Sequence, residues 1–545
     1  MGFRVTLLIF IFAFLYSALT LNIYNLQLEE GDYYKAKAES IYRSSGIFKP
    51  KRGNIYFTDK NENTIPASLN REYPTVYAIP EDVEDPFKAA KFIAETLELS
   101  EEDLITSLSK KNDPYEPIAP KVADSIALAI KEFGEKGIHV GYEPFRFYPL
   151  GSIASHVLGF VSTDVDNKIG LYGIESYYEE LLNGSSGSIE EDIFVSPRDG
   201  KDLNLAIDRN IQTQSESILK ELISDYSAKS GSVIVQNPKT GEILAMANFP
   251  NFDPNKYNEY SVKNFLNPSV QAIYEPGSIF KVITMAIGLD AGKFTPETKY
   301  LDSGSITYNG RTIRNWDLKA HGQVTMTNVL EKSLNTGAAN AERLIGHDLF
   351  YDYLVKFGLK EQTGIDLPGE VAGSLKPLEE SKRDINFATA SFGQGISVTP
   401  IRLINAISAI ANGGVMMRPY LNKELKPEIE DRVISASASK EITDMMISAV
   451  DKAEVAKING YTVAGKTGTA QVPDFARGGY KDEVINTYVG FAPAHNPKFT
   501  ILIKLDEPSG APLAGLTVVP AFREIAQFIL NYYSVPPDRT DKAIR

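Results

Sequence analysis

The sequence lacks cysteine altogether, which excludes disulfide bonds, a thiolate nucleophile and zinc sites built on cysteine. It also has no run rich in lysine or arginine, and its net charge is −14 at pH 7. Such an acidic chain is not expected to bind nucleic acid or the acidic face of a membrane. Five histidines occur in 545 residues, and no G-x-S-x-G turn accompanies them, so the sequence does not indicate a histidine-activated serine.

One long uncharged run is present near the N-terminus, from Val5 to Tyr24. About 20 helical residues span the hydrocarbon core of a bilayer. The only nearby positive charge, Arg4, precedes the run, so the N-terminus should stay inside and the bulk of the chain outside. A cleaved signal peptide is the alternative, but this run is longer than the usual apolar region and no small-x-small cleavage site follows it. We therefore favour an uncleaved anchor.

The remaining chain divides at changes in pattern. Short β-like pieces with a polar turn predict a hairpin over 48–69, and two helical patterns lie within 87–137. Turn residues followed by an alternating strand over 196–208 indicate a boundary. Over 205–532 a strand is followed by helices and then by further strands, and this order favours a layered α/β or α+β domain.

A serine three residues before a lysine occurs four times, and serine and lysine at this spacing share one face of a helix. The four serines are Ser107, Ser217, Ser278 and Ser437. Only Ser278 follows a Pro-Gly helix start, and the run IFKVITMAIGL after it is apolar except for Lys281. Such a helix is expected to be buried, and burial lowers a lysine pKa, so Lys281 could act as general base for Ser278. The alternative is a helix-capping serine with a lysine that reaches solvent.

Two further motifs are ambiguous when taken alone. Ser333 and Asn335 precede a helical stretch, where they could relay a proton and hold an amide or could simply cap the helix. Lys466 lies on a strand-like run and could present a positive charge to a carboxylate or keep an edge strand soluble. Residues 460–467 also match the phosphate-loop pattern letter for letter. That loop needs a buried strand before it and a helix after it, and neither is indicated here.

In the order Ser278, Ser333 and Lys466, these motifs form the S-x-x-K, S-x-N and K-T-G set of penicillin-interacting serine enzymes. The longer strings YEPGSIFKVIT, KSLNTG, AGKTGTAQ and SFGQGISVTPIRL resemble class B penicillin-binding proteins. Upstream, KRGNIYFTDKNENTIPAS resembles the pedestal motif of that family, although DKNE replaces its usual aspartate-arginine-asparagine-glycine turn. The DKNEN segment also resembles the start of a calcium loop, but it lacks the required glycine and glutamate, so we expect a turn.

The resemblance implies a multidomain α/β (α+β) fold. It comprises an N-terminal transmembrane helix, an elongated mixed pedestal domain, and a serine penicillin-recognising transpeptidase domain with a central antiparallel sheet flanked by helices. The expected limits are 1–28 for the cytoplasmic stub and anchor, 29–200 for the pedestal, 201–532 for the transpeptidase domain and 533–545 for a tail.

The resemblance further implies a peptidoglycan D,D-transpeptidase that β-lactams acylate. Ser278 would attack the penultimate D-Ala carbonyl with help from Lys281, Ser333 would pass a proton to the leaving amine, and Asn335 would orient the donor. The substrate carboxylate would be bound by the K-T-G strand, residues Lys466, Thr467, Gly468 and Thr469. The backbone N–H groups of Ser278 and Thr469 would form the oxyanion hole.

Location and partners follow from the same resemblance. The chain would sit in the bacterial cytoplasmic membrane as a single-pass protein, with stem peptides as substrates and β-lactams as inhibitors. A polytopic membrane glycosyltransferase and other wall-synthesis proteins are expected partners, whereas nucleic acid, a cofactor and a metal are not expected. The YEPGS start and the segment 315–322 favour the division branch over the elongation branch. A β-lactam sensor or hydrolase and a scaffold that activates a glycosyltransferase are the alternatives.

Overall fold

The computed structural model describes residues 2–25, 50–110, 113, 115–162, 168–190, 193–474, 477–510 and 513–539. The N-terminal apolar run forms helix α1 (Gly2–Tyr24), as predicted. Within those ranges it is the one helix long and apolar enough to cross a membrane. The polar, tyrosine-rich sequence over 27–44 has helical spacing and predicts a stalk that leaves the membrane, but these residues lie outside the described ranges.

The pedestal, described from residue 50 to about residue 200, is built on a long hairpin. Strand β1 (Ile55–Thr58) pairs antiparallel with β2 (Thr64–Ala78), which confirms the predicted hairpin. Its turn is closed by Asp59, whose carboxylate accepts hydrogen bonds from the backbone N–H groups of Asn61 and Asn63. Strand β2 also pairs with β4 (Ile138–Phe147) and with β3 (Glu116–Ala119).

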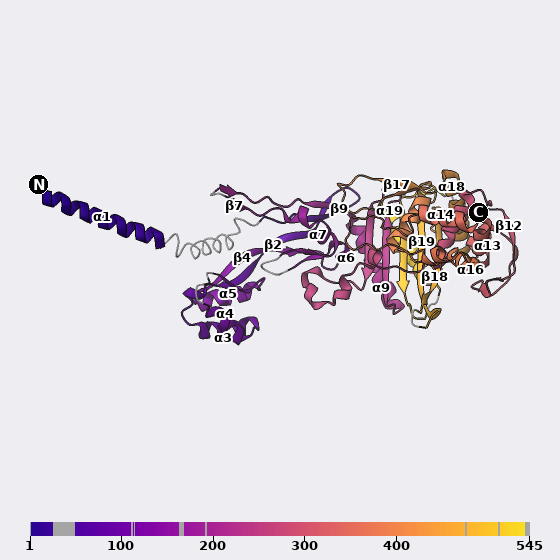
Figure 1. The fold of residues 1–545 in the computed structure, drawn as a ribbon. Coiled ribbons are helices and arrows are strands. Elements are labelled where there is room, and N and C mark those ends of the chain that lie inside the picture. Colours follow the sequence, from indigo (N-terminus) through magenta and orange to yellow (C-terminus); the bar gives the residue numbers. More distant parts are fainter. Residues whose placement is uncertain are drawn as a thin grey trace.

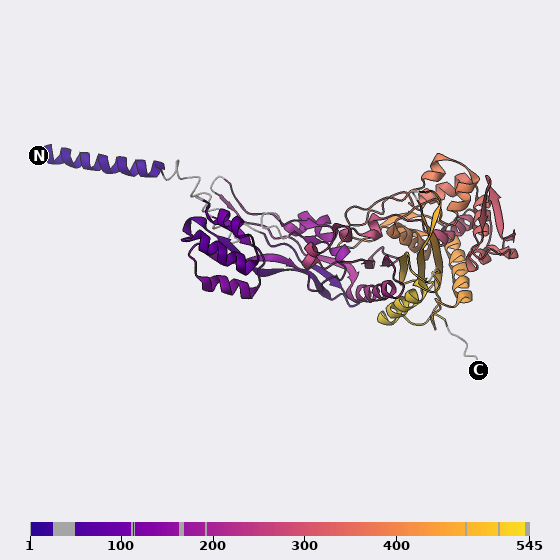
Figure 2. The ribbon, with the colours of Figure 1, turned by 90° about the horizontal axis from the view of Figure 1, so that it is seen from below.

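Three helices form the outer end of the pedestal: α3 (Pro86–Leu97), α4 (Glu101–Leu108) and α5 (Asp124–Phe133). Their apolar faces bury Ile93, Leu104 and Ile130 in a small core of their own. These helices lie at the far side of the pedestal from the catalytic domain, so the folded body is elongated (Figures 1 and 2).

Strand β9 (Leu203–Asp208) joins the two domains. It pairs in parallel with β1 and so completes the pedestal sheet just after the expected limit at residue 200. Its last residue, Asp208, accepts hydrogen bonds from two backbone N–H groups of helix α9 (Arg209–Asp225) and caps that helix. The chain therefore passes from the pedestal sheet into the catalytic domain without a linker.

The catalytic domain is built around an antiparallel five-stranded sheet with the order β11-β10-β20-β19-β18. The strands are β10 (Ser230–Gln236), β11 (Ile243–Phe249), β18 (Ala464–Pro473), β19 (Tyr480–Ala492) and β20 (Phe499–Asp506). Helices α9 and α19 (Val518–Tyr532) contact one face, and α17 (Pro400–Ala411) contacts the other. The sheet and the flanking helices agree with the predicted fold class, and β18 is left at the sheet edge.

The helices beside this edge carry the other motifs. Helix α11 (Lys281–Asp290) is buried along its whole length except for the last residue, as its apolar sequence predicts. It contacts α13 (Asn335–Ile345), α12 (Met326–Glu331) and α18 (Ala436–Ala453). The buried helix α11, the first turn of α13 and the edge strand β18 therefore lie around a common centre.

Four short strands outside the central sheet precede α12, and we call this segment, 299–325, the excursion. The strands are β12 (Lys299–Asp302), β13 (Ser305–Tyr308), β14 (Arg311–Arg314) and β15 (Gly322–Thr325). It is tied to α13 through the buried carboxylate of Asp302, which accepts a hydrogen bond from the Thr336 hydroxyl at 2.7 Å. The Asn315 side-chain amide donates to the same carboxylate at 2.9 Å. These bonds fix the first turn of α13 against the excursion.

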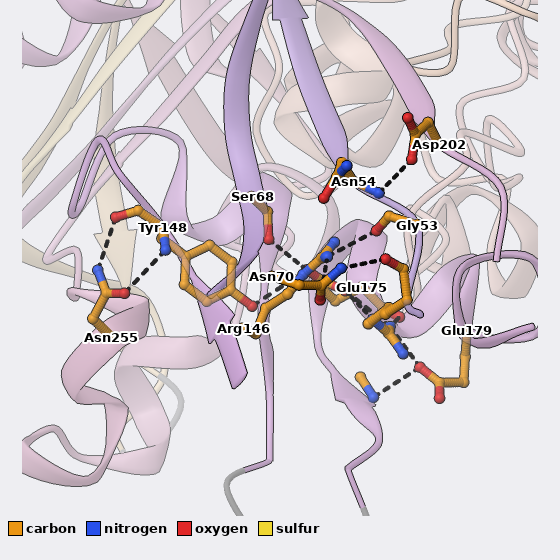
Figure 3. A network of polar contacts seen from close by, with 12 residues as sticks. Gly53, Asn54, Ser68, Asn70, Arg146, Tyr148, Glu175, Glu179, Asp202 and Asn255 are labelled. Carbon is orange, nitrogen blue, oxygen red and sulfur yellow. Dashed lines mark hydrogen bonds and ion pairs between the residues drawn. The ribbon is translucent and has the colours of Figure 1, made fainter. Parts of the chain in front are cut away.

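A buried ion network holds the pedestal together close to the catalytic domain (Figure 3). Glu175, on helix α7 (Gly173–Tyr177), is fully buried and pairs with Arg52 at 2.8 Å and with Arg146 at 2.6 Å. Burial alone would raise the pKa of Glu175, but the two guanidinium charges outweigh burial and hold this pKa below its usual range. Tyr148 also contacts Glu175, and its backbone N–H and carbonyl oxygen form two hydrogen bonds with the side-chain amide of Asn255 in the catalytic domain.

We predict that Glu175→Gln destabilises the pedestal. The near-isosteric amide keeps the volume but leaves the buried guanidinium of Arg146 without a carboxylate, which costs about 3–5 kcal/mol, whereas Arg52 keeps its ion pair with Glu179. Urea unfolding of the full chain should show a clear loss of stability, whereas Glu180→Gln, at an exposed position of the next helix, should unfold like the parent. Equal unfolding midpoints for Glu175→Gln and the parent would contradict a structural role for the network.

Candidate active site

Ser278 lies in a tight 3₁₀ turn, η5 (Gly277–Phe280), that leads directly into α11. The turn begins at Pro276, and Gly277 has a φ of 59°, which a glycine adopts without strain. No side chain caps this helix start, so Ser278 is not an N-cap residue. The turn instead leaves the Ser278 hydroxyl free to face the neighbouring motifs.

Lys281 is completely buried and does not reach solvent. Its Nζ lies 3.0 Å from Ser278 Oγ, 2.7 Å from the Ser333 carbonyl oxygen and 2.8 Å from Asn335 Oδ1. A neutral amine has two N–H groups, and the carbonyl and amide oxygens, which can only accept, use both. The nitrogen lone pair is then left for a hydroxyl hydrogen, which is the arrangement a general base for Ser278 requires.

The electrostatics of the two lysines favour that neutral form. Burial lowers the pKa of Lys281 well below its usual value, and the positive charge of Lys466 lowers it further. Burial also lowers the pKa of Lys466 to about 7. The site therefore holds two buried amines with lowered pKa values, Lys281 beside the candidate nucleophile and Lys466 on strand β18.

Ser333 bridges the two lysines. Its Oγ lies 3.2 Å from Lys281 Nζ and 3.0 Å from Lys466 Nζ. Its backbone φ of 53° is in the left-handed region, which is uncommon for a residue with a side chain. This conformation directs both its carbonyl oxygen and its hydroxyl to Lys281, so the strained backbone makes both contacts with the lysine possible.

The orientation of the Asn335 amide is set by its second contact. Its Nδ2 donates to the Arg314 carbonyl oxygen at 2.9 Å, so Oδ1 must be the atom that faces Lys281. The preceding excursion thus orients Asn335, and Asn335 in turn holds the lysine.

The K-T-G residues lie on the edge strand β18, where Lys466 is 4% exposed. Its ammonium points inward to Ser333 and to the carbonyl oxygen of Thr467 at 3.0 Å, so it is not a solubilising edge lysine. Because residues 464–473 form a continuous strand, the segment 460–467 has no helix after it and is not a phosphate loop.

Glycine at position 468 allows β18 to lie against the turn that carries Ser278. A Cβ there would come within 2.2 Å of Thr487 Oγ1 and 3.2 Å of the Pro276 carbonyl oxygen. Thr469 follows on the same strand, is exposed, and accepts a hydrogen bond from the Ala514 N–H at 3.4 Å. The close packing brings the strand backbone beside the serine.

A cavity of about 430 Å³ opens over this centre. Five of the predicted site residues line it: Ser278, Ser333, Lys466, Thr467 and Thr469. The other three, Lys281, Asn335 and Gly468, do not line the cavity but lie beside residues that do. The structure therefore brings together all eight residues that the sequence singled out.

The competing copies of the motifs lie elsewhere. Ser217 and Ser437 are exposed on helices α9 and α18, each with an exposed lysine three residues on, and Ser107 lies on α4 of the pedestal. Lys239, in the second K-T-G copy, occupies an exposed turn between β10 and β11. In each of these copies the lysine is exposed, whereas Lys281 is completely buried.

Several cavity residues carried no signal in the sequence. Trp316, Lys332 and Leu513 line the same cavity, and Trp316 donates its indole N–H to the Lys332 carbonyl oxygen at 3.0 Å. In the sequence, the segment 315–322 only favoured the division branch of the family and did not indicate a cavity. No motif or periodicity places these three residues together, because they come from the excursion, the end of α12 and the loop before α19.

Family models match most of the chain. The penicillin binding protein transpeptidase domain matches residues 231–527, and the penicillin-binding protein dimerisation domain matches residues 47–193. Stage V sporulation protein D of Bacillus subtilis is 35% identical over 90% of this chain and 80% of its own length. A peptidoglycan D,D-transpeptidase FtsI homolog of Mesostigma viride is 28% identical over 98% of this chain and 97% of its own.

Solved structures are similar over nearly the whole chain. Penicillin binding protein 3 of Mycobacterium tuberculosis, complexed with aztreonam, is 27% identical with a TM-score of 0.70, covering 90% of this chain and 98% of that one. Penicillin binding protein 2X of Streptococcus thermophilus is 25% identical with a TM-score of 0.72, covering 90% and 81%.

We predict that Lys466→Gln shifts the pH dependence of Ser278 acylation to higher pH. Lys281 acts as base only when deprotonated, so the rate rises with pH through its pKa. The charge of Lys466 lowers that pKa, and its removal must raise it. The rate of acylation by a penicillin, measured by stopped flow across the pH range, should also fall roughly 10- to 100-fold because the penicillin carboxylate loses a charged partner. Lys440→Gln, at an exposed site, is the matched control. If the rate rises through the same pH range in Lys466→Gln as in the parent, the electrostatic coupling between Lys466 and Lys281 is contradicted.

Proposed function

The chain belongs to the penicillin-binding protein transpeptidases with a dimerisation domain, the class B type, and on that premise we propose that it cross-links peptidoglycan through an acyl-enzyme on Ser278. The observation that carries the proposal is the 3.0 Å contact between the Ser278 hydroxyl and the buried amine of Lys281. The division branch is favoured, since the FtsI homolog aligns with 98% of this chain.

Acylation begins with proton transfer. The lone pair of Lys281 accepts the hydroxyl proton while Ser278 Oγ attacks the carbonyl carbon of the penultimate D-Ala. The negative charge that develops on the carbonyl oxygen is stabilised by the backbone N–H groups of Ser278 and Thr469. This role for Thr469 is supported by the close packing of β18 on the serine turn.

Collapse of the tetrahedral intermediate expels the terminal D-Ala as its amine. That amine needs a proton, and the Ser333 hydroxyl, which lies between Lys281 and Lys466, provides a path for it. The amine of a neighbouring stem then attacks the ester, and Ser278 recovers its proton as the cross-link forms.

The terminal carboxylate of the donor is bound by the K-T-G strand. A carboxylate beside Lys466 favours the ammonium form and raises the pKa of this lysine above its value of about 7 in the free site. Binding of the donor therefore restores a charge on Lys466, and the hydroxyl groups of Thr467 and Thr469 add hydrogen bonds. The strand backbone at Gly468 approaches the donor closely because no side chain intervenes.

Hydrolysis of the acyl-enzyme is the less favoured outcome. A β-lactam hydrolase needs a second base that activates water, and Glu331 is the one acidic side chain among the described residues that line the cavity. Its carboxylate is already engaged by Lys452 at 2.7 Å and by the Ser448 hydroxyl at 2.6 Å. These contacts lower its pKa despite burial, so it is a poor proton acceptor.

We propose that α1 anchors the enzyme in the bacterial cytoplasmic membrane with the N-terminus inside. The pedestal, expected over 29–200, then holds the transpeptidase domain, expected over 201–532, away from the bilayer toward the wall; 1–28 is the anchor and 533–545 the tail. A polytopic glycosyltransferase that supplies nascent strands is the partner that this placement suits.

The proposal predicts that a fluorescent penicillin labels the full chain on the peptide that contains Ser278. Label should disappear in Ser278→Ala and persist in Ser217→Ala, because Ser278 has the buried amine of Lys281 beside it whereas Lys220, three residues after Ser217, is exposed. Peptide mass spectrometry of the labelled protein identifies the site. A folded parent protein that takes no label, or label that survives in Ser278→Ala, would overturn the proposed nucleophile.

A further inference from the structure

One wall of the catalytic cavity is a loop without regular secondary structure. Residues 454–463, all of them within the described part of the chain, form neither helix nor strand and connect α18 to β18. Val455 and Ala456 of this loop line the cavity, as does Ala453 at the end of α18. Lys466 is the third residue of β18, directly after the loop. The position of this wall relative to the K-T-G strand therefore depends on what holds the loop.

The chain after α19 returns to contact this loop. We call residues 533–539 the strap, and their backbone makes two hydrogen bonds with the loop. The Tyr461 hydroxyl donates to the Val535 carbonyl oxygen at 2.6 Å. The Arg539 N–H donates to the Gly460 carbonyl oxygen at 3.1 Å. Val535 is also buried, in the same core cluster as Tyr461, so the strap packs against the loop as well as bonding to it.

Two side chains of the strap extend these contacts to both ends of the loop. The Asp538 carboxylate accepts hydrogen bonds from the backbone N–H of Thr462, at 2.8 Å, and from the Thr462 hydroxyl. The Arg539 guanidinium donates to both carboxylate oxygens of Asp451, at 2.7 and 2.9 Å. Asp451 lies on the last turn of α18, and Thr462 lies just before β18. Because a bidentate arginine–carboxylate pair fixes orientation as well as distance, the strap sets the spacing of the two elements that flank the wall.

Other hydrogen bonds of the loop place it less firmly in the domain. The Tyr461 N–H donates to the Ile458 carbonyl oxygen at 3.1 Å, which closes a local turn. The Ala494 N–H donates to the Thr462 carbonyl oxygen at 3.0 Å, which holds the end of the loop next to β18. Segments with few long-range contacts open locally at a low cost in free energy. The arginine of the strap adds a long-range contact on the α18 side of the loop.

We propose that the strap positions this wall for acylation, and that Arg539 is a positioning residue that acts through Asp451 and the loop without touching the ligand. The inference rests on the proposed function, since acylation of Ser278 is its readout. Ser278 and Lys281 belong to other elements, η5 and α11. Loosening the wall therefore weakens binding of the ligand and leaves the proton transfer from Ser278 to Lys281 unchanged.

The test separates binding from chemistry. Stopped-flow acylation of the full chain across a range of penicillin concentrations gives the dissociation constant of the reversible complex and the rate constant of the acylation step. We expect Arg539→Gln to raise the dissociation constant about 3- to 10-fold, the size of one partly exposed ion pair, with the rate constant within about 2-fold of the parent. Asp451→Asn should have the same effect, and the double variant should do no more than either alone because both changes remove one interaction.

Two further variants control for effects on the fold. Arg539→Asp combined with Asp451→Arg reverses the ion pair and should restore much of the affinity of the parent. Arg523→Gln, at an exposed position of α19, should leave the dissociation constant unchanged. An unchanged dissociation constant in Arg539→Gln, a loss confined to the acylation rate constant, or full additivity of the two single variants would overturn the role of the strap.

Hydrogen exchange gives a readout that does not depend on the proposed function. Amide exchange in the peptide that covers 454–463, followed by mass spectrometry, should be faster in Arg539→Gln than in the parent. Equal exchange rates would contradict the claim that the strap holds the loop. If penicillin never labels the parent on Ser278, the proposed function fails, while the exchange of the loop still decides whether the strap fixes this wall.

Discussion

The structure depends on one buried amine. An ammonium group in a fully apolar surrounding is costly, so Lys281 is stable there only as a neutral amine or with every N–H satisfied. The neighbouring residues supply acceptors for the N–H groups of Lys281. Ser333 adopts a left-handed backbone to offer its carbonyl oxygen, and Asn335 is turned by its contact with Arg314 to offer Oδ1. What remains of the amine, its lone pair, faces the serine.

Each of the three motifs is held by a different part of the fold. Ser278 precedes a helix buried in the main core, Asn335 begins a helix that Asp302 ties to the strand excursion, and Lys466 lies on the edge strand of the sheet. The edge position leaves one side of β18 open, so a substrate can lie along it as it would along a missing strand. The pedestal adds no group to the cavity lining in the described ranges, but it contacts the catalytic domain through β9 and through Asn255.

Much of this arrangement could be predicted from the sequence because it rests on local signals. The apolar run around Lys281 predicts burial, and the strand-like run around Lys466 predicts a strand. Two kinds of feature could not be predicted. The left-handed backbone of Ser333 is imposed by tertiary contacts, and a serine at that position does not indicate it. The Glu175 network joins Arg52, Arg146 and Glu175 from separate segments of the chain, so only the folded structure brings them together. The parallel pairing of β9 with β1 is non-local in the same way.

The most direct test is the ionisation state of Lys281 in the folded protein. Lysine labelled with ¹³C and ¹⁵N at the side-chain amine, with Lys281→Met to assign the resonance, allows its titration to be followed by NMR. The account predicts a midpoint well below the usual 10.5, because burial and the charge of Lys466 both disfavour the ammonium form. A resonance that stays that of an ammonium up to about pH 10 would contradict a base role for Lys281, and with it the mechanism.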